Sequence, residues 1–347
     1  MFISETVAFI SDIHLGVHQD ATLWHRIALE YAQDLKVKLK NLGILDIIIP
    51  GDIFHNRSEV SVATLQIARE FFDILKDFKI TITVGNHDCY YKDRSDVNSV
   101  SILRSHQIKV IDSLETVDIF NKKISFVPWA TPIHQIPKSD IIVGHFDIVG
   151  FYLNSFRVCD HGFTTRNLLD KATTIISGHF HRPDHRKYDK GQILYVGSPY
   201  QQTFADIDIN NGCYIFDIKR EEIVDFIPNT VSPKHIKIKL SSILDKTLSL
   251  QTLKEIVPNN IISLLADSNV PLESVTTLTA KLAALGPSHL RTDFNYENIS
   301  HTHERDLDLT AVDIATSIVE FVDTLDTTYK QDINEYLLDL YKRKASA

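Results

Sequence analysis

The sequence is short of the features that mark secreted and membrane proteins. Its three cysteines, Cys89, Cys159 and Cys213, are an odd number without CxxC spacing, which disfavours a disulfide framework and a zinc knuckle. No stretch approaches the roughly 18 apolar residues of a membrane span, and Glu5 precedes the first apolar run, where a secretory signal would carry basic residues. These absences predict a protein of a reducing cytoplasm that has no membrane partner.

The chain also lacks an excess of positive charge. It carries 36 Lys and Arg against 45 Asp and Glu, a net charge of −9, so its surface as a whole is not that of a protein that coats nucleic acid. An enzyme with a local basic or metal-bearing cleft is compatible with this balance. At 347 residues, the chain is long enough for one large α/β domain and a smaller one.

What the sequence does contain is a repeated pattern of a short apolar run followed by polar residues. The runs are continuously apolar, as in strands that are covered on both faces. Residues 22–40 and 61–78 show helical spacing between the early runs, which predicts parallel strands with right-handed crossovers. Since ligands bind at the carboxyl ends of such strands, we expect the polar ends to gather. The pattern comprises VAFI–SDIH (7–14), LDIIIP–GDIFH (45–55), ITITV–GNHD (80–88), DIIV–GHFD (140–147), TTIIS–GHFH (173–181) and ILYV–GSP (193–199).

The gathered side chains have the composition of a metal site. Each motif alone is more often a turn or a cap, and a lone HxH is ambiguous, but five such ends in one chain favour function. Burying four histidines and two aspartates without a cation would be costly. Imidazole mixed with carboxylate and amide oxygen suits Mn²⁺, Fe or Zn in an open catalytic site, and seven donors suit two ions that share Asp52, the usual arrangement for phosphate ester hydrolysis. The seven are Asp12, His14, Asp52, Asn86, His145, His179 and His181, with His55, His87 and Asp88 beside them.

The ordered motifs over residues 12–181 resemble the calcineurin-like metallophosphoesterases. The resemblance implies an α/β fold, a two-sheet sandwich flanked by helices. FVPW (126–129), GHFH (178–181) and YVGSP (195–199) are further similar to SbcD-type DNA nuclease subunits of double-strand-break repair, and GHFDIVGFY (144–152) to the recombination-endonuclease subunits of T-even-type phages. The likeness is strong to about residue 230 and thin beyond.

Carried over residue by residue, the resemblance implies two Mn²⁺ ions, with Mg²⁺, Fe or Zn as alternatives. Asp12, His14, Asp52 and His181 would hold the first ion, and Asp52, Asn86, His145 and His179 the second. His87 would protonate the departing 3′-oxygen, Asp88 would hold its imidazole, and His55 would contact phosphate or help to position the substrate strand. The expected substrate contacts are Gly197, Ser198, Pro199, Arg57 and Arg182, although an arginine in a loop is, taken singly, more often solvated surface.

The resemblance further implies 3′→5′ exonuclease action on duplex DNA and endonuclease cleavage of single strands or hairpins. The expected partners are DNA and an SbcC-like ATPase of the SMC family, with a homodimer inside a heterotetramer in the cytoplasm (of the host, if phage-encoded). The expected domains are a nuclease domain over 1–230, a small αβ cap over 231–286 that orients DNA, a linker over 287–307 and an ATPase-binding helical segment over 308–347.

Two other functions share the metal motifs. A phosphoesterase of small substrates, such as a cyclic nucleotide or a phosphomonoester, would need every metal ligand, although GDIFH and the C-terminal helices argue against it. A non-catalytic adaptor for the ATPase would have no reason to keep a complete ligand set with His87. The helical pattern over 308–347 has its own alternative, which is packing on the chain's own core.

Overall fold

The computed structural model describes residues 4–153, 157–267 and 270–295, together with positions 322, 330, 331, 333, 334 and 336–338. The chain divides into two units, Met1–Asn295 and Tyr296–Ala347. The described positions of the second unit are helical. The rest of the expected helical segment over 308–347 lies outside the described residues, as does the linker beyond residue 295.

The first sheet has six strands in the order β12-β11-β1-β2-β3-β4. Strands β1 to β4 run parallel, and β11 and β12 join antiparallel at one side. The apolar runs at 7–10, 45–50 and 80–84 thus form neighbouring parallel strands, as predicted. The strands are β1 (Thr6–Phe9), β2 (Asp46–Ile49), β3 (Lys79–Thr83), β4 (Ile108–Ile111), β11 (Gly212–Asp217) and β12 (Glu222–Pro228).

The second sheet also has six strands, in the order β5-β6-β7-β8-β10-β9. Its four central strands are parallel, and an antiparallel strand closes each edge. The strands are β5 (Glu115–Ile119), β6 (Lys122–Val127), β7 (Ile141–His145), β8 (Thr174–Gly178), β9 (Asp184–Tyr188) and β10 (Gly191–Tyr195).

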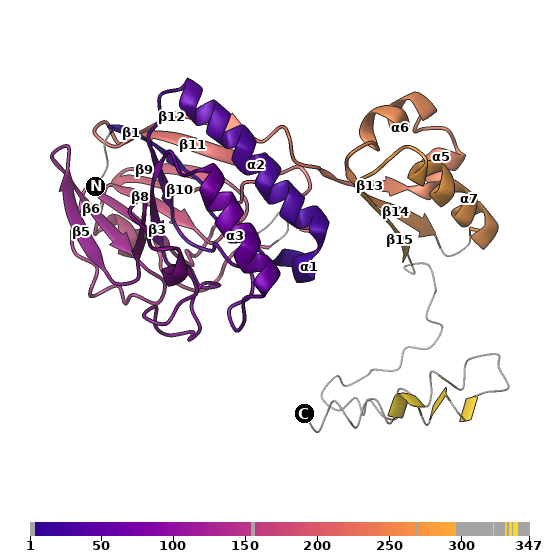
Figure 1. Ribbon diagram of the computed structural model, residues 1–347, viewed down its shortest axis with the longest axis horizontal. Helices are drawn as coiled ribbons and strands as arrows, with labels where there is room; N and C mark the ends of the chain where they lie inside the picture. The colour runs from indigo at the N-terminus through magenta and orange to yellow at the C-terminus, as the bar shows by residue number, and fades with distance from the viewer. Residues whose placement is uncertain are drawn as a thin grey trace. The chain divides into compact units, whose positions relative to one another are not determined.

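The two sheets pack face to face, and helices α2 (Thr22–Asn41) and α3 (Val62–Ile74) cover the outer face of the first sheet (Figure 1). Side chains of a strand alternate between these two layers. Val7 of β1 packs in the inter-sheet core, whereas Ala8 packs with the helices. This arrangement is the expected two-sheet sandwich, and it explains why the strands are apolar on both faces.

Short elements connect these layers. Ser61 caps α3, because its side chain accepts a hydrogen bond from the Thr64 backbone N–H at 3.0 Å.

No helix among the described residues is both long and apolar enough to cross a membrane. The remaining elements of this region are α1 (Val17–Asp20), α4 (Thr165–Leu169) and the 3₁₀ turns η1 (Val100–Leu103) and η2 (Phe204–Asp206).

A small αβ domain follows, with its own apolar core. Three parallel strands form its sheet, in the order β13-β14-β15, and three helices accompany them. Strand β15 lies within the stretch predicted as a linker over 287–307, so residues 289–295 belong to the sheet instead. The elements are β13 (His235–Lys239), α5 (Leu240–Leu244), α6 (Leu250–Ile256), β14 (Ile261–Asp267), α7 (Leu272–Ala283) and β15 (His289–Asn295).

Candidate metal centre

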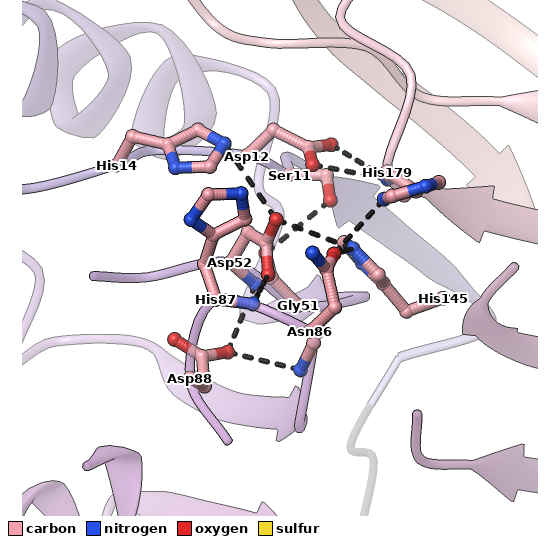
Figure 2. A network of polar contacts seen from close by, with 12 residues as sticks. Ser11, Asp12, His14, Gly51, Asp52, Asn86, His87, Asp88, His145 and His179 are labelled. Carbon is pink, nitrogen blue, oxygen red and sulfur yellow. Dashed lines mark hydrogen bonds and ion pairs between the residues drawn. The ribbon is translucent and has the colours of Figure 1, made fainter. Parts of the chain in front are cut away.

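The seven predicted donors lie together, and they come from both sheets. Figure 2 shows the side chains that follow β1, β2 and β3 turned toward those that end or follow β7 and β8. The sandwich therefore aligns the carboxyl ends of two parallel sheets at one place. The first sheet supplies Asp12, His14, Asp52 and Asn86, and the second supplies His145, His179 and His181.

One half of the cluster is built by Asp12, His14 and His181, whose ligand atoms lie within 4.8 Å of one another. Nε2 of His14 is 3.1 Å from Nε2 of His181 and 3.6 Å from Oδ2 of Asp52. Two imidazole nitrogens can lie this close only if one carries a hydrogen and donates a hydrogen bond to the other, or if a cation lies between them.

The other half is built by Asp52, His145 and His179, which again lie within 4.8 Å of one another. Oδ1 of Asn86 is 2.9 Å from both His145 Nε2 and His179 Nδ1, and Asp52 Oδ2 is 3.3 Å from His145 Nε2. The same carboxylate oxygen of Asp52 thus faces both halves. This is the position that a bridging ligand needs.

The residues fit a pair of divalent cations. Nε2 of His14, the nitrogen that faces His181 and Asp52, belongs to a buried side chain. Burial lowers the pKa of His14 well below its usual value, so the imidazole is neutral and able to bind a cation. Burial alone would raise the pKa of Asp52, but the neighbouring imidazole of His145 lowers it, so this carboxylate is ionised.

Four of the seven donors have a strained backbone conformation. Asp12, His14, Asp52 and His179 have φ angles of 56°, 50°, 57° and 94°, in the left-handed region that costs a residue with a Cβ about 1–3 kcal/mol. Strained residues of this kind gather at functional sites, where the surrounding structure holds them in place. The strain supports the assignment of these four residues to one functional centre.

A family model described as calcineurin-like phosphoesterase matches residues 5–183, a range that contains all seven donors. The chain belongs to the calcineurin-like phosphoesterases. The family uses a two-metal site, and the two halves of the cluster supply candidate ligands for each ion.

Similar proteins include a phage nuclease subunit. Exonuclease subunit 1 of Enterobacteria phage T4 is 30% identical over 235 residues, which cover 64% of this chain and 67% of that protein. A solved structure of an archaeal phosphodiesterase aligns with 65% of this chain and 99% of its own, at 13% identity and a TM-score of 0.36. The family model and the phage protein confirm the resemblance stated from the sequence.

Two motif glycines of this phosphoesterase allow the loops to approach one another. A Cβ on Gly85 would lie 2.3 Å from Asp52 Oδ1, and one on Gly51, whose φ is +107°, would lie 2.4 Å from His145 Nδ1. Both distances are shorter than any side chain tolerates. Glycine before Asp52 and before Asn86 is therefore required for Asp52 and His145 to reach their positions.

His87 lies beside His14, at the edge of the cluster. Its ring centroid is 4.8 Å from that of His14. Nδ1 of His87 is 2.6 Å from the backbone carbonyl oxygen of His55, and the two imidazoles stack with centroids 5.6 Å apart. The carbonyl fixes the ring by Nδ1 and leaves Nε2 for another partner.

The prediction that Asp88 holds the His87 imidazole was wrong. The buried carboxylate of Asp88 instead accepts hydrogen bonds from four backbone N–H groups, which gather at the loop after β2 and at the end of β3. A carboxylate turned toward four amides is not available to the ring. The donors are the N–H groups of Asp52 at 2.9 Å, Ile53 at 2.9 Å, Phe54 at 3.1 Å and Gly85 at 3.0 Å.

The GSP turn was expected to meet the nucleotide, but all three of its residues are buried. The Ser198 N–H donates to the carbonyl oxygen of His181 at 3.0 Å, and its hydroxyl donates to that of Tyr200, also at 3.0 Å. The turn from Gly197 to Pro199 thus supports the loop that carries His181, and its burial does not fit a substrate contact.

The two predicted arginines have different surroundings. Nη2 of Arg57 donates to the carbonyl oxygen of Asn86 at 2.8 Å and so braces the loop that carries that amide. Arg182 lies over the ring of Tyr152 at 5.0 Å and lines a groove of about 790 Å³ that also includes Lys234 and Lys237. Of the two, Arg182 is the better placed to meet an anionic strand.

Sequence reasoning missed Asp147. Its Oδ1 lies 2.7 Å from Nε2 of His179, the nitrogen opposite the one that faces Asn86. A carboxylate in this position orients a metal-binding imidazole and increases its basicity. Asp147 is the last residue of GHFD, so the motif contained it, but nothing in the sequence paired it with a histidine 32 positions away.

Proposed function

We propose that this phosphoesterase is a Mn²⁺-dependent DNA nuclease, which acts as a 3′→5′ exonuclease on duplex DNA and as an endonuclease on single strands and hairpins. The observation that carries the proposal is the pair of donor groups that share Asp52, with His87 beside them. The T4 relative is named as an exonuclease, which favours DNA over a small substrate.

Different residues would hold each of the two cations. Asp12, His14 and His181 would hold one cation, Asn86, His145 and His179 the other, and Asp52 both. When bound, the two cations supply charge that stabilises the phosphoryl oxygens and lowers the pKa of the attacking water. As the new bond between the water oxygen and phosphorus forms, the bond from phosphorus to the 3′-oxygen breaks.

His87 supplies the proton for the departing oxygen. The carbonyl oxygen of His55 accepts from Nδ1, so in the imidazolium form Nε2 carries the second proton. That proton passes to the 3′-oxygen, which leaves as a hydroxyl, and the neutral imidazole regains it from solvent. The stacked His55 ring then lies where a phosphate of the same strand can meet it.

We further propose that the protein works with an SbcC-like ATPase of the SMC family, as a homodimer within a heterotetramer. The relative is named as a subunit, which supports a partner. In this proposal residues 308–347 bind the ATPase, and the small αβ domain that follows residue 230 orients DNA. The groove lined by Arg182, Lys234 and Lys237 supports the latter role, since these cations offer phosphate contacts.

The test is digestion of duplexes labelled at either the 5′ or the 3′ end, with Mn²⁺ and with the full chain. A progressively shortened 5′-labelled strand, with early release of the 3′ label as a mononucleotide, is expected. The Asp52→Asn variant should be inactive, while Asp118→Asn, an exposed carboxylate on β5, should digest normally. Hydrolysis of small phosphoesters without DNA digestion would favour the small-substrate enzyme. Failure to bind metal would favour the adaptor.

A further inference from the structure

The loop between β7 and α4 brings a carboxylate, a thiol and an imidazole together outside the seven-donor centre. Backbone hydrogen bonds tie its two branches, since the Phe163 N–H donates to the Asp147 carbonyl and the Gly150 N–H to that of Cys159, both at 2.8 Å. One ligand atom from each of Asp147, Cys159 and His161 consequently lies within 4.8 Å of the others.

The separation between the sulfur and one imidazole nitrogen is close to that of a tetrahedral metal site. Sγ of Cys159 is 3.9 Å from Nδ1 of His161, whereas the opposite ring nitrogen, Nε2, is the one that lies 3.6 Å from Oδ1 of Asp147, and one ion can bind only one of these nitrogens. With Zn–S of about 2.3 Å and Zn–N of about 2.0–2.1 Å, a sulfur and a nitrogen on one tetrahedral ion lie roughly 3.6 Å apart. The His161 side chain is 60% exposed, so its ring can turn to complete the geometry.

The local charge favours a cation, and the donors favour a soft one. The carboxylates of Asp160 and Asp147 raise the pKa of His161, and the positive charge of Arg157 lowers it by less. The electrostatic potential at this ring is therefore negative. Thiolate with imidazole selects zinc-class ions over Mn²⁺ or Mg²⁺, which prefer oxygen ligands. Burial raises the pKa of the Cys159 thiol, so the ion must displace the thiol proton into solvent as the metal–sulfur bond forms.

We propose that Asp147, Cys159 and His161 form a separate, cysteine-containing site for a zinc-class cation. The site is coupled to the seven-donor centre, because the Asp147 carboxylate also accepts from His179. An ion bound in the loop draws charge from the carboxylate that orients His179, so it weakens binding of the second cation. This consequence for catalysis rests on the proposed function, whereas binding at the loop does not.

The test is titration of the full-length protein with Co²⁺ as a spectroscopic substitute for zinc. Thiolate bound to Co²⁺ gives a near-ultraviolet charge-transfer band, and the seven-donor centre cannot produce it because none of its donors is a cysteine. We expect the band in the wild-type protein and its loss in Cys159→Ser. His161→Asn, a change at an exposed side chain, should weaken Co²⁺ binding at this site about tenfold or more. Cys213→Ala, in β11, is the matched control and should keep the band.

Each outcome separates this site from the nuclease proposal. A band that persists in Cys159→Ser, or no band in folded wild-type protein, would overturn the loop site even if DNA is digested normally. The band without any DNA digestion would leave the loop site in place and remove the nuclease. Zn²⁺ added after Co²⁺ should abolish the band by displacement. A band that survives excess Zn²⁺ would contradict a zinc-class site.

Discussion

Asp147 and His179 form a half-buried pair in which Oδ1 of the carboxylate lies 2.7 Å from Nε2 of the ring. The other ring nitrogen, Nδ1, lies 2.9 Å from Asn86 Oδ1, inside the seven-donor cluster. The hydrogen bond at Nε2 thus fixes the orientation of the ring, and Nδ1 faces the donor cluster. His145 follows the same rule with a backbone partner, since its Nδ1 lies 2.7 Å from the carbonyl oxygen of Pro50.

Asp147→Ala should weaken binding of the second cation by about 10–100-fold, the usual effect of removing a partner that orients a metal-binding histidine. Asp147→Glu should restore part of the affinity, because it returns the carboxylate. Calorimetric Mn²⁺ titration measures this without relying on nuclease activity. Asp160→Ala, which removes a carboxylate that is 86% exposed, is the control and should bind both ions normally. Wild-type affinity in Asp147→Ala would rule out the positioning role.

His87→Ala should keep both cations but cleave DNA about 10²–10⁴-fold more slowly, because the leaving oxygen loses its proton donor. Mn²⁺ titration and the single-turnover rate on a labelled duplex measure the two effects separately. His106→Ala, at an exposed position in the loop before β4, is the matched control. A variant that lost metal together with activity would instead place His87 among the ligands.

The motifs of the sequence sufficed to predict the strands and the donor cluster, because both depend on local pattern. A short apolar run that is followed by Asp52 or Asn86 predicts both a buried strand and a polar side chain at the carboxyl end of that strand. The carboxyl ends of parallel strands must then meet. The sequence did not show that the cluster spans two sheets, which follows from their face-to-face packing.

The misassigned features depend on contacts that no local pattern records. Asp88 follows a histidine in the sequence, but its carboxylate turns to the backbone of another loop. Ser198 lies in a motif that looks exposed, but the packing of the loops buries it. The left-handed φ of Asp12 or Asp52 is likewise imposed by tertiary structure, against the residue's own preference.

Asp88→Ala should destabilise the fold rather than slow the chemistry alone. Four backbone N–H groups would lose their buried acceptor, and each unsatisfied group costs roughly 1–3 kcal/mol. We expect the free energy of unfolding to fall by about 3 kcal/mol or more in urea denaturation. Asp93→Ala, an exposed neighbour, is the control. A large loss of rate with unchanged stability would restore the role of orienting the His87 ring.

His235 gives the fold a pH dependence that is independent of the metal centre. Its ring packs between those of Trp24 and Phe204, with centroids 5.8 Å and 4.7 Å away. Burial lowers the pKa of His235 to about 4, although the Asp206 carboxylate opposes the shift. Nδ1 of the ring has no hydrogen-bond partner among the described residues, so no hydrogen bond stabilises the charged form there.

In the unfolded chain the pKa of a histidine is about 6.5, so between pH 6.5 and 4 the unfolded state binds the additional proton. The stabilisation by neutral His235 is therefore complete above about pH 6.5 and is lost as the pH falls toward 4, by about 3 kcal/mol in all. Urea denaturation in EDTA at several pH values measures it. His235→Phe keeps the ring packing but cannot titrate, so its unfolding free energy should fall less steeply across this window. Parallel pH curves for the two proteins would show that folding does not lower the pKa of His235.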